Sequence, residues 1–224
     1  MRLAFAAAAA LLAVPAPAPL AAQSVRGRLE GRVPAEALPA IDSLVAQAVV
    51  ESLPSEPLVQ KALEGGAKGV PADRLVAGVR RGLGQLRDAR AILARASPAR
   101  AAADGDVAAV AAGLARGLAP PLVERMLAAM PAEAPGPVLH AAADLVAHRF
   151  PPDSAADLLV TAEREGLRGV RLLDVAAAAS RELQRGGGRT PADALARVRA
   201  MLPDVPEAPR PHPRSVTRRA GPGS

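Results

Sequence analysis

Apolar residues recur along most of the chain at the three- and four-residue spacing of amphipathic helices. The clearest example is the row Leu38, Ile41, Leu44, Val45, Ala48 and Val49, which lies opposite Asp42, Ser43, Gln47 and Glu51. Apolar residues at this spacing cover one side of a helix. No segment shows the sustained alternation of apolar and polar residues that is typical of a strand. The pattern therefore predicts an all-α fold.

Prolines and glycines divide this pattern into short helices. Proline is favoured in the first helical turn and glycine directly after the last turn. We expect one helix between Pro54 and Gly69 and a longer one from Pro71. Thr190, directly before Pro191, is expected to cap the last helix. Further helices are expected to begin near Asp106, Pro120, Pro137, Pro152, Arg168 and Pro191.

The punctuating residues repeat at an offset of 97 positions. Pro34-Ala35-Glu36-Ala37 recurs as Pro131-Ala132-Glu133-Ala134, and 11 of the 53 positions from 34 to 86 are identical at this offset. Other matched pairs are Pro54 with Pro151, Gly69 with Gly166, and Arg74-Leu75 with Arg171-Leu172. Units of this kind bury one face against a neighbour. The offset predicts a duplicated three-helix unit, arranged either as a compact two-lobed domain or as a short solenoid-like array.

The N-terminus has the layout of a secretory signal peptide. Arg2 precedes the unbroken apolar run from Leu3 to Val14, which is 12 residues long. A membrane-spanning helix needs about 20 residues. Prolines and the small residues Ala21 and Ala22 follow before Gln23. We therefore expect cleavage after Ala22 and a periplasmic or secreted protein without a transmembrane segment.

These features divide the chain into six segments. They are the signal peptide 1–22, a polar lead-in 23–33, repeat copy 1 at 34–96, connecting helices 97–130, repeat copy 2 at 131–202, and a tail 203–224 that is rich in Pro and Arg. The tail has few residues that could be buried, so we expect it to be disordered.

The composition excludes several classes of function. The chain has no Cys, no Trp, no Tyr and only two Phe. The absence of Cys removes disulfides and thiolate metal sites. The scarcity of aromatic side chains removes the stacking platforms that bind single-stranded nucleic acid. The net charge of +6 is modest for the chain length, so we expect no specific nucleic-acid partner.

His140, Asp144 and His148 lie at successive four-residue intervals on one predicted helix. Their four-residue spacing places two imidazoles and one carboxylate on the same side of a helix, a donor set suited to zinc or iron. At the offset of 97 the same positions are Ser43, Gln47 and Glu51, which form the polar stripe of the first copy. A solvated polar face is therefore the simpler interpretation, and a metal site is the alternative.

The remaining candidate chemistry has simpler interpretations. The glycines between Gly65 and Gly69 resemble a phosphate-binding loop only in part, and the helix-ending residues Ala162–Gly166 lie at the same positions of the second copy. A serine hydrolase set would have to use His140 or His148. The carboxylate pairs Asp104/Asp106 and Glu163/Glu165 fall at expected helix ends. No catalytic residue and no cofactor is predicted.

The sequence therefore predicts an exported, non-enzymatic helical repeat protein that binds a protein or peptide at the cell envelope. One alternative is a metal-binding protein or metalloenzyme that uses the two histidines and Asp144. Another is an electrostatic adaptor whose basic tail contacts anionic envelope polymers. The tail carries its positive charge on Arg210, Arg214, Arg218 and Arg219.

Overall fold

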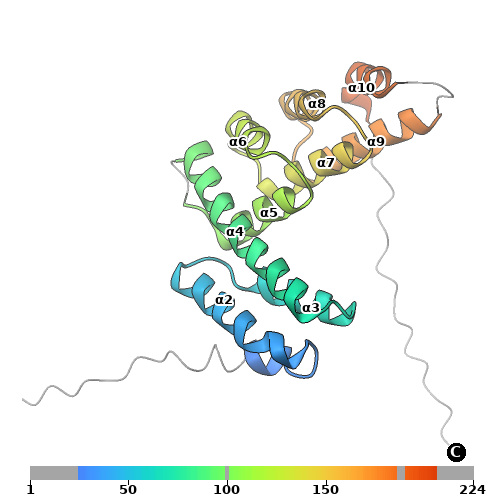
Figure 1. The fold of residues 1–224 in the computed structure, drawn as a ribbon. Coiled ribbons are helices and arrows are strands. Elements are labelled where there is room, and N and C mark those ends of the chain that lie inside the picture. Colours follow the sequence, from blue (N-terminus) through green and yellow to red (C-terminus); the bar gives the residue numbers. More distant parts are fainter. Residues whose placement is uncertain (1–24, 99–100, 186–189, 206–224) are drawn as a thin grey trace, which may run out of the picture. The chain divides into compact units, whose positions relative to one another are not determined.

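A computed structural model describes residues 25–98, 101–185 and 190–205, and every regular element in them is helical (Figure 1). The predicted all-α fold is confirmed. The predicted signal peptide and residues 206–224 of the predicted tail lie outside the described residues. The elements are η1 (Ala35–Ala37), α2 (Leu38–Val50), α3 (Glu56–Ala67), α4 (Ala72–Ala96), α5 (Asp104–Ala115), α6 (Pro120–Ala129), α7 (Pro135–Ala147), α8 (Pro152–Arg164), α9 (Arg171–Arg185), α10 (Pro191–Ala200) and η2 (Leu202–Asp204).

The chain divides into two compact units within α4, between Leu83 and Gly84. The first unit contains a helical turn at 25–29, then η1, α2, α3 and the N-terminal half of α4. The predicted polar lead-in is thus partly helical. The core of this unit is apolar and almost fully enclosed. It includes Leu29, Ile41, Leu58, Val59, Leu75 and Val79, each at most 3% exposed.

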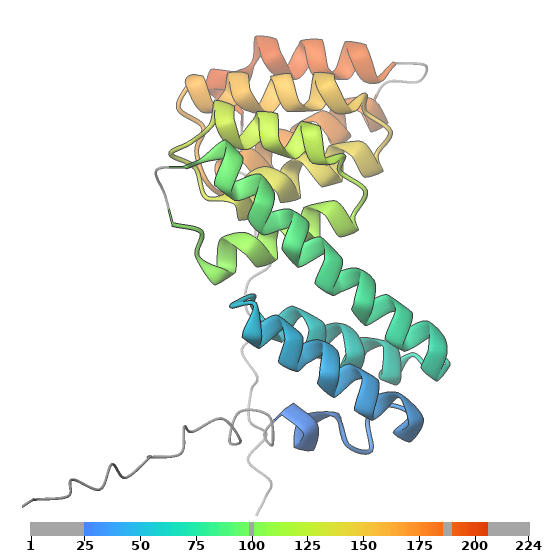
Figure 2. The same ribbon diagram turned by 60° about the vertical axis from the view of Figure 1, so that its left-hand side comes forward.

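The second unit is built from helical hairpins that stack in two layers. α7 packs on α5 and on α9, and α8 packs on α6 and on α10. Within each hairpin, α7 also packs on α8 and α9 on α10. Figure 2 shows α6, α8 and α10 stacked along one side of this unit and α5, α7 and α9 along the other. α5 and α6, which the sequence placed in a connecting segment, are therefore the first hairpin of this stack.

Most of the predicted helix boundaries agree with the structure. Helices begin at Pro120, Pro152 and Pro191 as expected, and the other expected starts lie within three residues of the observed ones. Thr190 forms a capping box with Asp193, which confirms its predicted role. Gly69 and Gly166 have φ angles of 64° and 89° directly after their helices, the left-handed conformation of a C-terminal glycine cap.

The two predicted repeat copies share local geometry at the offset of 97 residues. α2 and α7 cover the same 13 positions of the two copies. Each helix is followed by a residue with positive φ, Ser52 at 52° and Arg149 at 64°. The next backbone N–H, of Leu53 or Phe150, donates to the carbonyl five residues earlier, at 2.8 and 3.1 Å. These features support the duplication of the three-helix unit, which stays a prediction.

The core of the second unit consists mainly of Ala, Leu and Val. Phe150 is the only aromatic residue in the described part of the chain, and it is 2% exposed. Short alanine side chains allow neighbouring helices to approach closely. None of the described helices combines the length and apolar character that crossing a membrane requires.

Candidate functional site

The outer side of α5, α7 and α9 carries a largely apolar groove with a volume of about 370 Å³. α5 and α7 pack closely here: a Cβ atom at Gly113 of α5 would lie 3.4 Å from the Cβ of Leu139 on α7, the short end of ordinary van der Waals contact. The groove exists because most side chains that line it are short. They are Ala109, Ala112 and Gly113 of α5, Gly136, Pro137, Leu139 and His140 of α7, Leu173 of α9, and Arg116. We call this surface the α5–α7–α9 groove.

Polar side chains form one edge of the α5–α7–α9 groove. The Arg116 guanidinium pairs with the Asp144 carboxylate, which links the end of α5 to α7. The Nε2 atom of His140 lies 3.5 Å from Oδ2 of the same carboxylate. His140 keeps 59% of its side-chain surface exposed, so it remains accessible to a ligand. Two of the three predicted site residues therefore lie together at a groove, with Arg116 as a third partner.

His148 does not join this group. It is the residue that follows α7, and its Nδ1 lies 2.8 Å from the backbone carbonyl oxygen of Asp144. Within the described residues, no group of three His, Cys, Asp or Glu side chains lies close enough to hold a metal ion. The Asp144 carboxylate pairs instead with Arg116 and His140. The metal alternative therefore has no preformed ligand set in this structure.

The glycines near the end of α3 serve helix packing rather than phosphate binding. A Cβ atom on Gly66 would overlap the backbone carbonyl oxygen of Arg32, and one on Gly65 would overlap the Leu75 side chain. The contact at Gly66 requires glycine because it is with backbone, whereas the end of the Leu75 side chain could move away from a larger residue at position 65. Lys68 pairs with Glu64 on the same helix. This segment is therefore the packed end of a helix.

Three of the carboxylates that the sequence singled out at helix ends have structural roles. Glu163 pairs with Arg168 at 3.3 Å, and Asp104 and Asp106 lie in the first turn of α5, where negative charge is favourable. Glu133 is 8% exposed and accepts a hydrogen bond of 2.7 Å from the backbone N–H of Gly169. It tethers the turn before α7 to the turn before α9.

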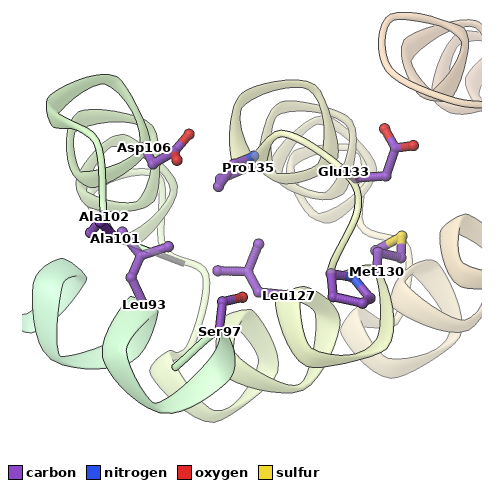
Figure 3. Close-up of a pocket in the computed structure, with 10 residues that line it drawn as sticks. Leu93, Ser97, Ala101, Ala102, Asp106, Leu127, Met130, Glu133 and Pro135 are labelled. Atoms are coloured by element: carbon purple, nitrogen blue, oxygen red, sulfur yellow. The ribbon is translucent and has the colours of Figure 1, made fainter. Parts of the chain in front are cut away.

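Glu133 also lines a small cavity with Asp106, Leu93, Leu127 and Pro135 (Figure 3). Figure 3 shows the Asp106 and Glu133 carboxylates on separate sides of this cavity, with Pro135 between them. The cavity volume is about 10 Å³. A single water molecule needs about that much space. The cavity is therefore too small for a substrate.

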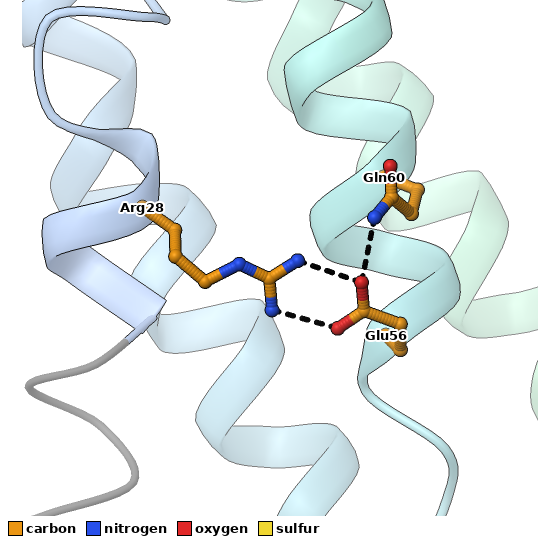
Figure 4. A network of polar contacts seen from close by, with 3 residues as sticks. All are labelled: Arg28, Glu56 and Gln60. Atoms are coloured by element: carbon orange, nitrogen blue, oxygen red, sulfur yellow. Dashed lines mark hydrogen bonds and ion pairs between the residues drawn. The ribbon is translucent and has the colours of Figure 1, made fainter. Parts of the chain in front are cut away.

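The first unit contains a polar network that the sequence did not predict. Arg28, on the helical turn 25–29, donates from Nη1 and Nη2 to both carboxylate oxygens of Glu56, at 2.7 and 2.6 Å (Figure 4). Gln60 donates to Oε1 of the same carboxylate at 2.6 Å. The hydrogen bonds from Arg28, and then the one from Gln60, lower the pKa of Glu56 to about 2.

Similar ion pairs connect helices in the second unit. Arg125 of α6 pairs with Asp153 of α8, and Arg95 of α4 pairs with Glu124 of α6 at 2.9 Å. Arg125 and Asp153 are the residues at an offset of 97 from Arg28 and Glu56. A search for an Arg and an acidic residue that repeat together at this offset would have found both pairs.

Comparisons with protein-family models, with curated proteins and with solved structures found no match to this chain.

Proposed function

We propose that this chain is an exported, non-enzymatic helical protein that binds an exposed segment of a partner protein in the α5–α7–α9 groove. The observation that carries the proposal is this groove, which extends across three stacked helices and has an almost entirely apolar lining. Stacked helical hairpins commonly use such an extended surface to bind peptides. The N-terminal signal-like segment supports export.

The chemistry of the groove indicates what the partner contributes. The lining residues from α5 are alanines and a glycine, so the groove has space for a bulky side chain between α5 and the leucines of α7 and α9. Aromatic and large aliphatic side chains are the usual anchors of protein interfaces. The only described aromatic residue of this chain, Phe150, is buried. The anchor must therefore come from the partner, as an aromatic or large aliphatic side chain.

The polar edge of the groove can orient such a segment. Arg116 and His140 both carry N–H groups beside the apolar floor, and a bound peptide offers backbone carbonyl oxygens to such donors. Asp144 holds both side chains at this edge through its carboxylate. A partner segment with its anchor in the groove would then place its backbone against this edge.

Site-specific crosslinking in the native host tests this proposal. A photoreactive amino acid is placed at Ala112, which is exposed and lines the groove, and in a matched variant at Ala128, which is exposed on α6. The crosslinked partner peptide is then identified by mass spectrometry. We expect crosslinks from position 112 to map to a segment with an aromatic or large aliphatic residue, and few crosslinks from position 128.

Filling the groove provides the second measurement. Ala112→Trp would occupy the space proposed for the anchor, whereas Ala128→Trp adds the same side chain to a surface outside the groove. We expect the Ala112→Trp variant to lose the crosslinked partner at least tenfold and the Ala128→Trp variant to keep it. Equal capture by both tryptophan variants, or equal crosslinking from both positions, would contradict the proposal.

The distribution of charge favours a second function, contact of the C-terminal tail with anionic envelope polymers. The described residues carry 21 basic and 21 acidic side chains, so the net charge of +6 comes entirely from the rest of the chain. Residues 206–224 contain four arginines and one acidic residue, Glu207. Arginine pairs well with phosphate and other oxyanions.

The structure also anchors the start of this segment. Val205 is 3% exposed, and its carbonyl oxygen accepts a hydrogen bond of 2.7 Å from Nη2 of Arg171. Nη1 of Arg171 donates to the buried carboxylate of Asp174 at 3.0 Å. The basic segment therefore begins at a fixed point beside α9. Val205 lies two residues beyond the predicted start of the tail at Pro203, so the first residues of the predicted tail belong to the packed structure.

Retention on immobilised heparin, a sulfated polyanion, tests this second function. We expect deletion of residues 206–224 to abolish retention and raised salt to weaken it steeply in the full chain, as for other polyanion contacts. The control variant changes Arg197 and Arg199 of α10 to Gln and removes two positive charges from the folded part. This function would be overturned if the chain without residues 206–224 were still retained on heparin. It would also be overturned if the Arg197 and Arg199 control variant lost as much retention as the deletion.

A further inference from the structure

We propose that the chain has two equivalent binding grooves, one in each unit, for polypeptide segments that carry an apolar residue next to an acidic one. The first groove is lined by Gly31, Arg32, Leu63, Gly66 and Ala67 and has a volume of about 490 Å³. The second lies between α6 and α8, has a volume of about 300 Å³, and includes Arg125, Ala129, Asp157, Val160, Thr161 and Arg164. Neither groove is part of the α5–α7–α9 groove.

Three positions of the two grooves correspond at the offset of 97, although Arg32 and Ala129 lie just before the predicted copies 34–96 and 131–202. Arg32, Leu63 and Ala67 of the first groove correspond to Ala129, Val160 and Arg164 of the second at the offset of 97. The turn 25–29 corresponds to part of α6, and α3 to α8. The second groove includes Arg125, which pairs with Asp153, and the equivalent pair Arg28–Glu56 joins the same two elements of the first unit. Three lining positions are therefore shared by the two grooves.

At two corresponding positions, each groove carries one arginine and one alanine, but the arginine lies on opposite walls in the two grooves. In the first groove, one wall carries Arg32 and the facing wall carries Ala67. In the second groove the order is reversed, with Ala129 on the first wall and Arg164 on the facing wall. Each groove thus has one exposed guanidinium and one methyl group at these two positions, with the positions exchanged. This exchange favours a ligand that carries one anionic group in either groove.

The other lining residues indicate a polypeptide ligand. Leu63 and Val160 form an apolar floor at equivalent positions, and both are partly exposed. A guanidinium binds a carboxylate through two parallel hydrogen bonds, and an adjacent apolar floor accepts a hydrophobic side chain. In the second groove Asp157 adds a carboxylate, which can accept backbone N–H groups of a peptide, and Arg125 is already paired with Asp153. A peptide with an acidic residue next to an apolar residue can pair with the guanidinium and at the same time place a side chain on the apolar floor.

Gly66 is what makes the first groove possible. Because it has no side chain, the backbone carbonyl of Arg32 packs directly against α3. This contact holds the segment with Arg32 beside Leu63 and Ala67.

Selection from a phage library of random 12-residue peptides, followed by calorimetric titration of a selected synthetic peptide, tests this proposal. We expect the selected peptides to share a Glu or Asp next to a large apolar residue. We also expect the titration to give two peptides per chain. In the variants Arg32→Ala and Arg164→Ala we expect one high-affinity site each, with about tenfold or greater weakening at the altered groove. In the double variant both sites should weaken.

Matched variants show whether peptide binding depends on the guanidinium of each groove. Arg32→Lys keeps the positive charge and should retain two sites, although more weakly because lysine cannot form the bidentate pair. Arg80→Ala removes an exposed arginine of α4 that lines neither groove and should change nothing. Ala112→Trp blocks only the α5–α7–α9 groove, so it should also leave both sites intact. Loss of peptide binding in Ala112→Trp but not in the double variant would overturn this inference and support the first proposed function instead.

Two further outcomes would overturn the proposal. One is a set of selected peptides without acidic residues. The other is a stoichiometry that stays the same in the two single arginine variants. The circular dichroism spectrum and the melting temperature of each variant show that the exposed arginines were removed without unfolding the chain.

Discussion

Arg28 and Glu56 form a bidentate ion pair across a separation of 28 residues, and Arg125 and Asp153 form an ion pair at the same separation. Both pairs connect a helical segment to the second helix that follows it in the chain. Because all four side chains are substantially exposed, each pair contributes modestly to stability. Each pair links two helical segments of its own unit. A pair that repeats at the offset of 97 also favours a common origin for the two segments.

The Arg28–Glu56 pair predicts a pH dependence that can be measured directly. The pKa of Glu56 in the folded chain is about 2, because of hydrogen bonds from Arg28 and then Gln60. An unfolded Glu has a pKa of about 4.3. The stabilisation from this pair is therefore fully present above that value and is lost as the pH falls through the folded pKa. Since the carboxylate is exposed, we expect its contribution to be about 1 kcal/mol or less.

NMR titration of the Glu56 side-chain carboxyl carbon measures this shift. Because solvent weakens this exposed pair, we expect a midpoint below that of an unfolded Glu in the unmodified chain, and a higher midpoint in Arg28→Gln. Gln60→Ala removes only the second hydrogen bond and should raise the midpoint by less. A midpoint near the value of an unfolded Glu in the unmodified chain would show that the pair does not persist in solution.

Residues with a left-handed backbone conformation at helix ends give the second prediction. Arg149 has a φ of 64°, a conformation that costs a residue with a side chain about 1 kcal/mol and costs glycine much less. We therefore expect Arg149→Gly to raise the free energy of unfolding by about 0.5–1 kcal/mol. Gly166 has a φ of 89° with open space around it, so Gly166→Ala should lower this free energy by about 1 kcal/mol.

Urea denaturation of both variants checks this prediction. Ala46→Gly, in the exposed interior of α2, serves as the control for glycine itself and should destabilise by about 1 kcal/mol. A destabilised Arg149→Gly variant would mean that contacts of the arginine side chain outweigh its backbone conformation.

Local signals in the sequence predicted the helices well. Proline at Pro120, Pro152 and Pro191 and glycine at Gly69 and Gly166 act through their own backbone preferences, which do not depend on the rest of the fold. The start of α5 at Asp104 was harder to predict. Gly105 suggested a break in the helix, but it lies in the first turn of α5. The helix therefore begins two residues earlier than expected.

Relationships between distant residues were harder to predict. His140 and Asp144 were recognised from their spacing, but Arg116 joins them only because α5 packs on α7. The α5–α7–α9 groove likewise depends on which alanines face outward after the hairpins stack. The sequence pattern shows the apolar side of one helix but does not show which helix will cover it.

The geometry around Asp144 predicts that zinc does not stabilise the chain. No group of three His, Cys, Asp or Glu side chains in the described segments could hold a metal ion, and His148 lies against a backbone carbonyl instead. A preformed site at a hundredfold excess of zinc over its dissociation constant would add about 2.7 kcal/mol of stability. We expect an unchanged melting temperature in excess zinc and zinc content near zero after desalting. Stoichiometric zinc that is lost in both His140→Ala and His148→Ala would instead support the metal alternative.

Gly66 gives the most specific test of packing in the first unit. A Cβ atom there would overlap the backbone carbonyl oxygen of Arg32, and a backbone atom cannot move aside as easily as the end of a side chain. We therefore expect Gly66→Ala to destabilise the chain by about 1–3 kcal/mol, the usual cost of overpacking, even though alanine favours helix. Gly84→Ala in α4 is the matched control, because a Cβ atom at Gly84 meets nothing within 4 Å. That substitution should stabilise by about 0.5–1 kcal/mol. In urea denaturation, a lower free energy of unfolding for Gly66→Ala and a higher one for Gly84→Ala would confirm that the segment around Arg32 packs directly on α3. A higher free energy of unfolding for Gly66→Ala would show that this segment and α3 are not in contact.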